Sequence, residues 1–273
     1  MKQNAIVMPE RFYSLDNNMS LDKIFQAKNN NQPLIGKVVF WNSKSKSLEI
    51  DLGNGYIGYI PIEYASIYPT LFPDGKLTPY VRTIIGKTVI VTVLDILSSE
   101  GNHKITLSRI DTMLSAFDFI SNSIGKEIQC CISSFSSLGI FVDAGNGVNG
   151  LIHNNDLCIP RLHHFSDIGF NVGDELTLKV IYVNDKFQVS LNYKDQFENL
   201  SFQLNTGDLI EATILDSFNE DGYYAFVNPN TPAIVNVPFF IPCEYGDKVL
   251  ARVRNQRKKH PEQLRLSFVS FTD

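Results

Sequence analysis

Two stretches of the sequence decide the fold, and each reads as a β-hairpin. Residues 138–157 read LGIFVDAGNGVNGLIHNNDL, and residues 47–62 read SLEIDLGNGYIGYIPI. In both, an alternating strand runs into a Gly-Asn-Gly turn, and a second strand then begins at a glycine. Such a turn needs residues that tolerate positive φ, as glycine and asparagine do. The same hairpin is therefore expected in two separate parts of the chain.

Each hairpin lies inside a longer repeat, and a third, divergent copy follows. Every copy opens with a glycine, a polar residue and an alternating strand. A second glycine followed by a polar residue then precedes a strand rich in β-branched residues. The last strand of each copy ends in an apolar residue followed by serine. The copies run over 36–108, 125–190 and 207–267. Short alternating strands between Gly, Asn and Asp turns favour small antiparallel barrels, whose closure removes exposed strand edges. We therefore expect an all-β protein with three tandem barrels.

Helical periodicity is confined to short segments between or before these copies. Residues 19–29 place apolar side chains on one face, with Ser20 as a candidate N-cap, and residues 110–121 read as a linking helix. The predicted organisation is an N-terminal segment with a short helix (1–33), a first barrel (34–110), a linker helix (111–123), a second barrel (124–194), a linker (195–204) and a divergent third barrel (205–273).

Composition limits the function classes. The chain is 44% hydrophobic and 19% charged, which argues against disorder over most of its length. Its net charge of -5 argues against a general polycation, so a basic footprint must be local. No apolar run is long enough to span a bilayer and no signal-peptide core is present, so we expect a cytoplasmic protein without a membrane partner. The four cysteines form no C-x-x-C pair, as expected of buried thiols in a reducing compartment.

Motifs for catalysis are missing from the sequence. It contains no G-x-x-x-x-G-K-[ST], H-E-x-x-H or G-x-S-x-G pattern. His163 and His164 lie near Asp167, but no third ligand at metal-site spacing accompanies them. We therefore expect no enzyme activity, no cofactor and no metal.

At the repeat residues, the chain resembles the RNA-binding domain first named in ribosomal protein S1, which is a five-stranded OB-type barrel. The second copy carries the motif almost whole: Gly125, then GIFVDAGNGVNGLIH at 139–153, VGD at 172–174 and KFQVS at 186–190. The first copy resembles the variant of multi-repeat S1 proteins, with GYIP at 58–61, and the third resembles it at its ends. The resemblance implies three tandem S1-type OB-fold barrels that bind single-stranded RNA.

The resemblance also implies binding residues, chiefly in the second copy. Phe141 matches the stacking position, His153 the histidine position, Lys186 the cation of the last strand, and Asn184 the position where the family often has Asp. The alternative reading makes Phe141 a core residue and His153 a structural histidine. In the first copy the stacking positions fall near Lys46 and Glu49 and the histidine position is Pro61, which leaves Tyr59 and Lys104 as binding candidates; Trp41 could offer a ring or lie in the core.

Charge is unevenly distributed in the third copy. Residues 205–246 contain six acidic and no basic residues, whereas residues 247–265 contain seven basic and two acidic ones. Period-2 alternation puts Arg252 and Arg254 on one strand face. A basic ridge beside aromatic side chains on a neighbouring strand is the expected phosphate and base contact, although a solvated hairpin would also explain the charge run. Its members are Tyr224, Phe226, Arg252, Arg254, Arg257, Lys258, Lys259 and Arg265.

Two functional hypotheses follow. The first is a non-catalytic, monomeric protein that binds single-stranded RNA, chiefly mRNA, by base stacking and phosphate contacts in translation or at the ribosome. The second is an adaptor whose barrels bind protein and dock on the ribosome or another RNA-processing complex. The acidic balance and the replaced binding positions of the first copy motivate the second hypothesis.

Overall fold

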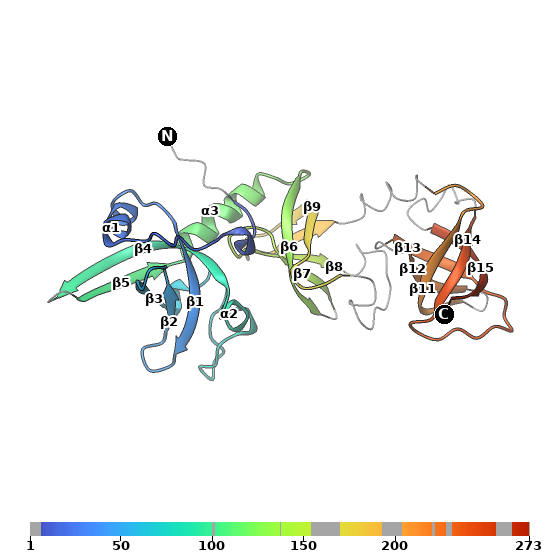
Figure 1. The fold of residues 1–273 in the computed structure, drawn as a ribbon, viewed down its shortest axis with the longest axis horizontal. Helices are drawn as coiled ribbons and strands as arrows, with labels where there is room; N and C mark the ends of the chain where they lie inside the picture. Colours follow the sequence, from blue (N-terminus) through green and yellow to red (C-terminus); the bar gives the residue numbers. More distant parts are fainter. Residues whose placement is uncertain are drawn as a thin grey trace. The chain divides into compact units, whose positions relative to one another are not determined.

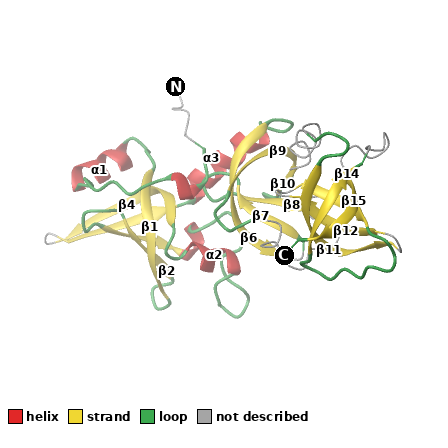
Figure 2. Ribbon diagram, turned by 45° about the vertical axis from the view of Figure 1, so that its right-hand side comes forward, coloured by secondary structure: helices red, strands yellow, loops and turns green. Residues whose placement is uncertain are grey.

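The computed structural model describes residues 7–99, 102–136, 138–153, 170–192, 204–219, 222–227, 231–254 and 264–272. Its strands form three closed five-stranded barrels, one from each repeat of the sequence (Figure 1). In the described part of the chain, short helices flank these strands (Figure 2). The all-β fold class with three OB-type barrels is thus confirmed. No helix within the described residues is long and apolar enough to cross a membrane.

The first barrel takes its strands from residues 34–108. They are β1 (Leu34–Asn42), β2 (Ser47–Asp51), β3 (Ile57–Pro61), β4 (Thr88–Ser99) and β5 (Asn102–Ser108), in the spatial order β1-β2-β3-β5-β4. Helix α1 (Leu21–Asn29) contacts β4, and Ser20 caps it by accepting a hydrogen bond from the backbone N–H of Lys23 at 3.3 Å. Three further short helices belong to this region: η1 (Glu10–Phe12), η2 (Ile62–Tyr64) and α2 (Pro79–Ile84).

The second and third barrels repeat this strand arrangement. In the second, β6 (Glu127–Ser136), β7 (Gly139–Asp143), β8 (Asn149–His153), β9 (Glu175–Val183) and β10 (Val189–Asn192) lie in the order β10-β8-β7-β6-β9, after the linking helix α3 (Ile110–Ser121). In the third, β11 (Leu209–Asn219), β12 (Gly222–Val227), β13 (Thr231–Asn236), β14 (Lys248–Val253) and β15 (Leu264–Phe271) lie in the order β11-β12-β13-β15-β14.

The Gly-Asn-Gly turns fold as the sequence predicts. Asn54 and Asn146 both adopt positive φ, at 51° and 48°, between glycines that also have positive φ. Strands on either side alternate regularly: Ile140 and Val142 are fully buried in the second barrel, as are Leu48 and Ile50 in the first. The turn chemistry and the period-2 pattern therefore set the register of the central hairpins.

Contacts between backbone positions divide the chain into two compact units that do not follow the repeat boundaries. The second repeat contributes to both units, so the predicted domain boundaries stay a prediction. One unit comprises Met1–Cys131, Asp143–Gly150 and Val183–Val189; the other comprises Ile132–Val142, Leu151–Tyr182 and Ser190–Asp273.

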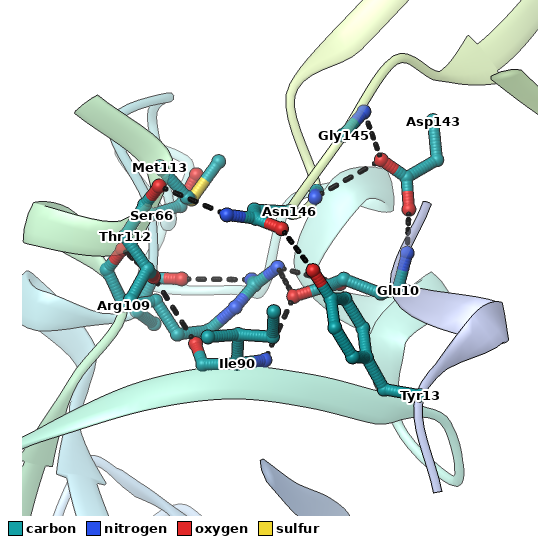
Figure 3. Close-up of polar contacts among 12 residues, drawn as sticks. Glu10, Tyr13, Ser66, Ile90, Arg109, Thr112, Met113, Asp143, Gly145 and Asn146 are labelled. Carbon is teal, nitrogen blue, oxygen red and sulfur yellow. Dashed lines mark hydrogen bonds and ion pairs between the residues drawn. The ribbon is translucent and has the colours of Figure 1, made fainter. Parts of the chain in front are cut away.

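A buried ion pair lies within the first unit (Figure 3). The Arg109 side chain is fully buried, and its Nη2 donates to both carboxylate oxygens of Glu10, at 2.8 and 2.9 Å. Nη1 donates to the backbone carbonyl of Ala65 at 3.0 Å, and Glu10 Oε1 also accepts from the N–H of Ile90 at 3.2 Å. Because charges this deep are costly unless paired, the pair ties the N-terminal segment to the first barrel.

The same N-terminal segment holds the Gly-Asn-Gly turn of the second repeat (Figure 3). The Glu10 N–H donates to Asp143 Oδ2 at 2.6 Å, and the Tyr13 hydroxyl donates to Asn146 Oδ1 at 3.0 Å. The Asn146 N–H in turn donates to the carbonyl of Met8 at 3.0 Å. We call the segment 7–13 the strap. The strap is not apparent in the sequence, because its partners lie 99 and 133 residues away in the chain.

Asp143 is the second carboxylate of this cluster. Its Oδ1 accepts from the N–H groups of Gly145 and Gly147, at 2.9 and 3.0 Å. Burial raises the pKa of Asp143 to about 7, and the carboxylate of Glu10 acts in the same direction, whereas the backbone donors lower it. The strap therefore contacts a carboxyl group that titrates near neutral pH.

Candidate nucleic-acid interface

In the second barrel, Phe141 lies on the outer face of β7. Its neighbours Ile140 and Val142 are fully buried, whereas Phe141 is partly exposed. Period-2 alternation thus turns the ring away from the core, which argues against the alternative that Phe141 is a core residue. A partly exposed ring on an outer face is the position that base stacking requires.

His153 lies on the same outer face, at the exposed end of β8. Gly139 stands opposite it: a Cβ there would overlap the carbonyl oxygen of Ile152 and contact the backbone of His153, and the φ of Gly139 is +149°. Because Gly139 and Phe141 are two residues apart, they share a face of β7. Position 139 therefore suits only glycine, because the backbone of Ile152 and His153 occupies the space that a side chain would take.

Asn184 and Lys186 lie together in the turn between β9 and β10. The Asn184 Oδ1 accepts from the N–H groups of Lys186 and Gln188, both at 3.0 Å, and Phe187 adopts a positive φ of 59°. Asn184 therefore shapes the turn, and Lys186 is exposed at its tip. The placement of Lys186 on the last strand was wrong, because β10 begins only at Val189.

The first barrel presents an outer row that crosses all five strands. Successive register pairs join Phe40 of β1, Glu49 of β2, Tyr59 of β3, Thr106 of β5 and Asp95 of β4. Phe40 is 55% exposed. The row carries two rings but also two carboxylates, which repel phosphate.

The remaining candidates of the first barrel lie near this row. Lys104 is exposed on β5, two residues before Thr106, and Trp41 packs against the core. Asp95 accepts a hydrogen bond from Lys28 Nζ at 2.6 Å, and this bond holds the pKa of that carboxyl below its ordinary value. The charge of Asp95 is thus paired with α1.

In the third barrel, the corresponding row begins at Asp216 of β11, which pairs with Tyr224 of β12, and ends at basic residues. Register pairs join Tyr224 of β12 to Ile234 of β13, and Ile234 to Arg265 of β15. The N–H of Arg254 donates to the carbonyl of Arg265 at 2.8 Å, which continues the row beyond β15. Arg252, two residues before Arg254, shares its face and pairs with Ser267. We call Arg252, Arg254 and Arg265 the arginine face.

Neighbouring groups hold the arginine face in place. Arg252 is exposed, and its Nη1 donates to the carbonyl of Gly207 at 3.1 Å. Arg254 is exposed, and its Nε donates to the hydroxyl of Ser267. Each anchored guanidinium has further donors, in the planar arrangement that suits phosphate.

Two expectations for the third barrel need correction. The aromatics of β12 are not on a strand next to β14, because β11 separates the two strands on one side and β13 and β15 on the other. Phe226 is only 4% exposed, so its ring is not accessible for stacking. The predicted ridge residues Arg257, Lys258 and Lys259 lie outside the described residues, as do His163, His164, Asp167 and Cys158.

An aromatic pair that the sequence did not predict lies in the loop between β13 and β14. Phe239 and Phe240 are 84% and 70% exposed, and their ring centroids are 5.6 Å apart. The signal in the sequence was two adjacent phenylalanines between prolines 238 and 242, outside any alternating strand. Within the described residues, no group of three or more histidine, cysteine, aspartate or glutamate side chains is placed to hold a metal ion.

Comparison with known proteins agrees with this geometry. Residues 123–194 match the family described as S1 RNA binding domain. Over 244 residues the chain is 25% identical to "Small ribosomal subunit protein bS1" of Staphylococcus saprophyticus, covering 85% of this chain and 57% of that protein. A 71-residue part is 45% identical to the bS1 protein of Coxiella burnetii, covering 26% of this chain and 12% of that protein.

An enzyme is also among the relatives. The "4-hydroxy-3-methylbut-2-enyl diphosphate reductase" of Fusobacterium nucleatum is 25% identical over 221 residues, covering 74% of this chain and 26% of that protein. The chain thus spans about half, or less, of the length of these relatives. It resembles S1-type RNA-binding proteins, most specifically in its second barrel.

Proposed function

We propose that this chain binds single-stranded RNA, and that the second barrel makes the primary contact. One observation carries the proposal: within the part that matches the S1 RNA binding domain, Phe141 is partly exposed on the outer face of β7, and His153 is exposed at the end of the adjacent strand β8. A base stacks on the Phe141 ring, and the imidazole of His153 donates or accepts a hydrogen bond at the neighbouring position.

In the proposed mode of binding, basic side chains contact the phosphate groups of the RNA. Lys186 offers one cation at an exposed turn, and the arginine face offers guanidinium groups on the third barrel. Such contacts supply most of the sequence-independent affinity, which falls as salt rises. The proposed binding is therefore tolerant of sequence and sensitive to ionic strength.

The relatives support a role in translation. Two of them are named as small ribosomal subunit proteins, and the proposal extends mRNA binding and ribosome association to this chain. We further propose a monomeric, cytoplasmic protein without catalytic activity. The reductase relative is covered over 26% of its length, so that likeness concerns a minor part of it.

A second function is favoured by one observation on the first barrel. Its outer row carries Glu49 and Asp95, and Phe40 is exposed at one end. An apolar ring beside carboxylates is better suited to bind a protein partner than to bind a polyanion such as RNA. The first barrel would then dock the chain on a partner such as the ribosome while the other barrels hold RNA.

A binding assay tests the main proposal. Fluorescence anisotropy of labelled single-stranded RNA, single-stranded DNA and duplex RNA is measured against protein concentration at several salt concentrations. We expect single-stranded RNA to bind most tightly, and Phe141→Ala to weaken it by about tenfold, the loss of one stacked base. Equal affinity for duplex, or no effect of Phe141→Ala, would overturn the proposal.

A further inference from the structure

We propose that the third barrel has its own binding site for single-stranded nucleic acid, built from the loop after β13 and the arginine face. In this site, Phe239 and Phe240 stack on bases, and Arg252 and Arg254 contact phosphates. The inference rests on the proposed RNA binding and deepens it, because it adds a second contact remote in sequence from Phe141.

The aromatic pair stands at the tip of a tight turn. The N–H of Ile241 donates to the carbonyl of Pro238 at 2.9 Å, so Phe239 and Phe240 are the two central residues of the turn. Val237 is buried before them, and Ile241 packs against the barrel core after them. The turn is therefore fixed at both ends, and its two rings are held in solvent.

This exposure is unusual enough to need an explanation. Phenylalanine side chains carry a large apolar area, and exposed apolar patches on soluble domains mark interaction sites. The two rings meet at 86°, in an edge-to-face arrangement. At 84% and 70% exposure, both rings offer aromatic surface to a ligand.

The turn begins two strands away from Arg252. Asn236, the last residue of β13, pairs with Ser267 of β15, and Ser267 pairs with Arg252 of β14. Phe239 follows Asn236 by three residues, which spans at most about 10 Å of chain. Neighbouring strands are about 4.8 Å apart, so Arg252 stands about 10 Å from Asn236. The rings and the guanidinium groups thus fall within the roughly four or more nucleotides that one OB-type barrel holds.

Charge favours nucleic acid over protein as the occupant. Arg252 and Arg254 are exposed, and aromatic rings beside guanidinium groups are the combination that binds single strands without sequence preference. The loop also carries Glu244 and Asp247, but the Asp247 carboxylate accepts the N–H of Glu244 at 2.7 Å and is engaged within the loop. An apolar protein partner would cover the rings and leave the arginine face unused.

A fluorescent reporter tests stacking directly. The chain has one tryptophan, Trp41 in the first barrel, so Phe239→Trp is introduced into full-length Trp41→Phe protein. Stacking of a base on the introduced indole would quench its fluorescence, so we expect quenching when single-stranded oligouridylate is added and recovery at high salt. An indole that does not meet the RNA gives no quenching, even while the RNA is bound.

An affinity measurement accompanies the reporter. We expect Phe239→Ala with Phe240→Ala to weaken binding of labelled single-stranded RNA by about tenfold or more. Phe72→Ala is the matched control, because this phenylalanine is also exposed, at 43%, in a loop of the first barrel. The control should change the affinity by less than about twofold, since it removes no stacked base. Circular dichroism melts confirm that each variant folds.

The outcomes separate the two proposals. If the unmodified chain binds no single-stranded RNA, the proposed function fails. If the chain binds RNA and Phe141→Ala weakens binding, but the double phenylalanine variant binds normally and the indole of the Phe239→Trp protein is not quenched, only the further site is overturned. If the double variant keeps RNA affinity and loses self-association in sedimentation equilibrium, the turn is a protein interface and the further site is again overturned.

Discussion

The first and third barrels share a strand order, yet the corresponding rows differ in charge: the first carries Glu49 and Asp95, whereas the third carries Asp216, Arg265 and Arg254. Where the first barrel places Glu49 on its second strand, the third places Tyr224. Where the first places Asp95 on its fourth strand, the third places Arg254 just after its own fourth strand. The same fold thus carries different charges along the same row, and the function of each barrel depends on these residues and not on the fold.

The two barrels also use arginine differently. Arg109, which follows the last strand of the first barrel, is fully buried and paired with Glu10 of the strap. Arg252 and Arg254 of the third barrel are exposed and anchored to neutral groups. The first barrel uses its arginine for structure, whereas the third presents arginines to a ligand.

The largest expected effect is on folding, at the buried pair. Arg109→Met leaves the Glu10 carboxylate buried without its cation, so we expect the free energy of unfolding of this unit to fall by about 3–5 kcal/mol. Urea unfolding followed by circular dichroism measures this loss. Arg254→Met is the matched control and should cost less than about 1 kcal/mol, because that side chain is exposed. Equal losses in the two variants would remove the distinction between the barrels.

The next effect concerns RNA affinity and its dependence on salt. Arg252→Ala with Arg254→Ala removes two phosphate contacts, so the slope of log affinity against log salt should become shallower by about 1.4, at about 0.7 per contact for single strands. Anisotropy titrations at several salt concentrations give the slope. Lys44→Ala with Lys76→Ala, at exposed loop lysines of the first barrel, should leave it unchanged.

The free energy of unfolding should depend on pH through Asp143, the carboxyl group that the strap contacts. The pKa of Asp143 is raised to about 7 in the folded chain, above its unfolded value near 4. Its contribution to stability is therefore fully present below about pH 4 and is lost as the pH rises through about 7. Asp143→Asn should flatten the change in unfolding free energy between about pH 5 and pH 8. An unchanged slope in this variant would show that another group titrates.

The smallest effect is expected at the acidic row itself. Asp95→Asn removes a surface pair with Lys28, so stability should change by less than about 1 kcal/mol. Because a carboxylate leaves the row, RNA affinity at low salt should rise slightly, by up to about twofold. A loss of RNA affinity in this variant would mean that the first barrel binds RNA through Asp95.

The sequence predicted the fold well because the fold depends on local signals. Alternating strands and Gly-Asn-Gly turns determine each hairpin, and the positive φ of Asn54 and Asn146 follows from the turn alone. Alternation also placed Arg252 and Arg254 on one face. These features need no knowledge of distant contacts.

The rest depended on contacts that sequence spacing does not reveal. Glu10 and Arg109 meet only in the folded chain, so the strap was not predicted. The expectation that the aromatics of β12 lie on a strand next to the basic strand β14 was wrong, because strand order in a barrel does not follow sequence order. Phe226 is buried between two core residues where alternation breaks down, and the exposed Phe239 and Phe240 lie outside any periodic segment.

One comparison tests the central claim most directly, namely that RNA is bound by the second and third barrels and not by the first. Phe141→Ala with Arg252→Ala is set against Tyr59→Ala with Lys104→Ala in the same anisotropy assay with single-stranded RNA. The account predicts a loss of about thirtyfold or more for the first pair, from one stacked base and one phosphate contact, and less than about threefold for the second. Equal losses, or the larger loss in the first-barrel pair, would contradict it.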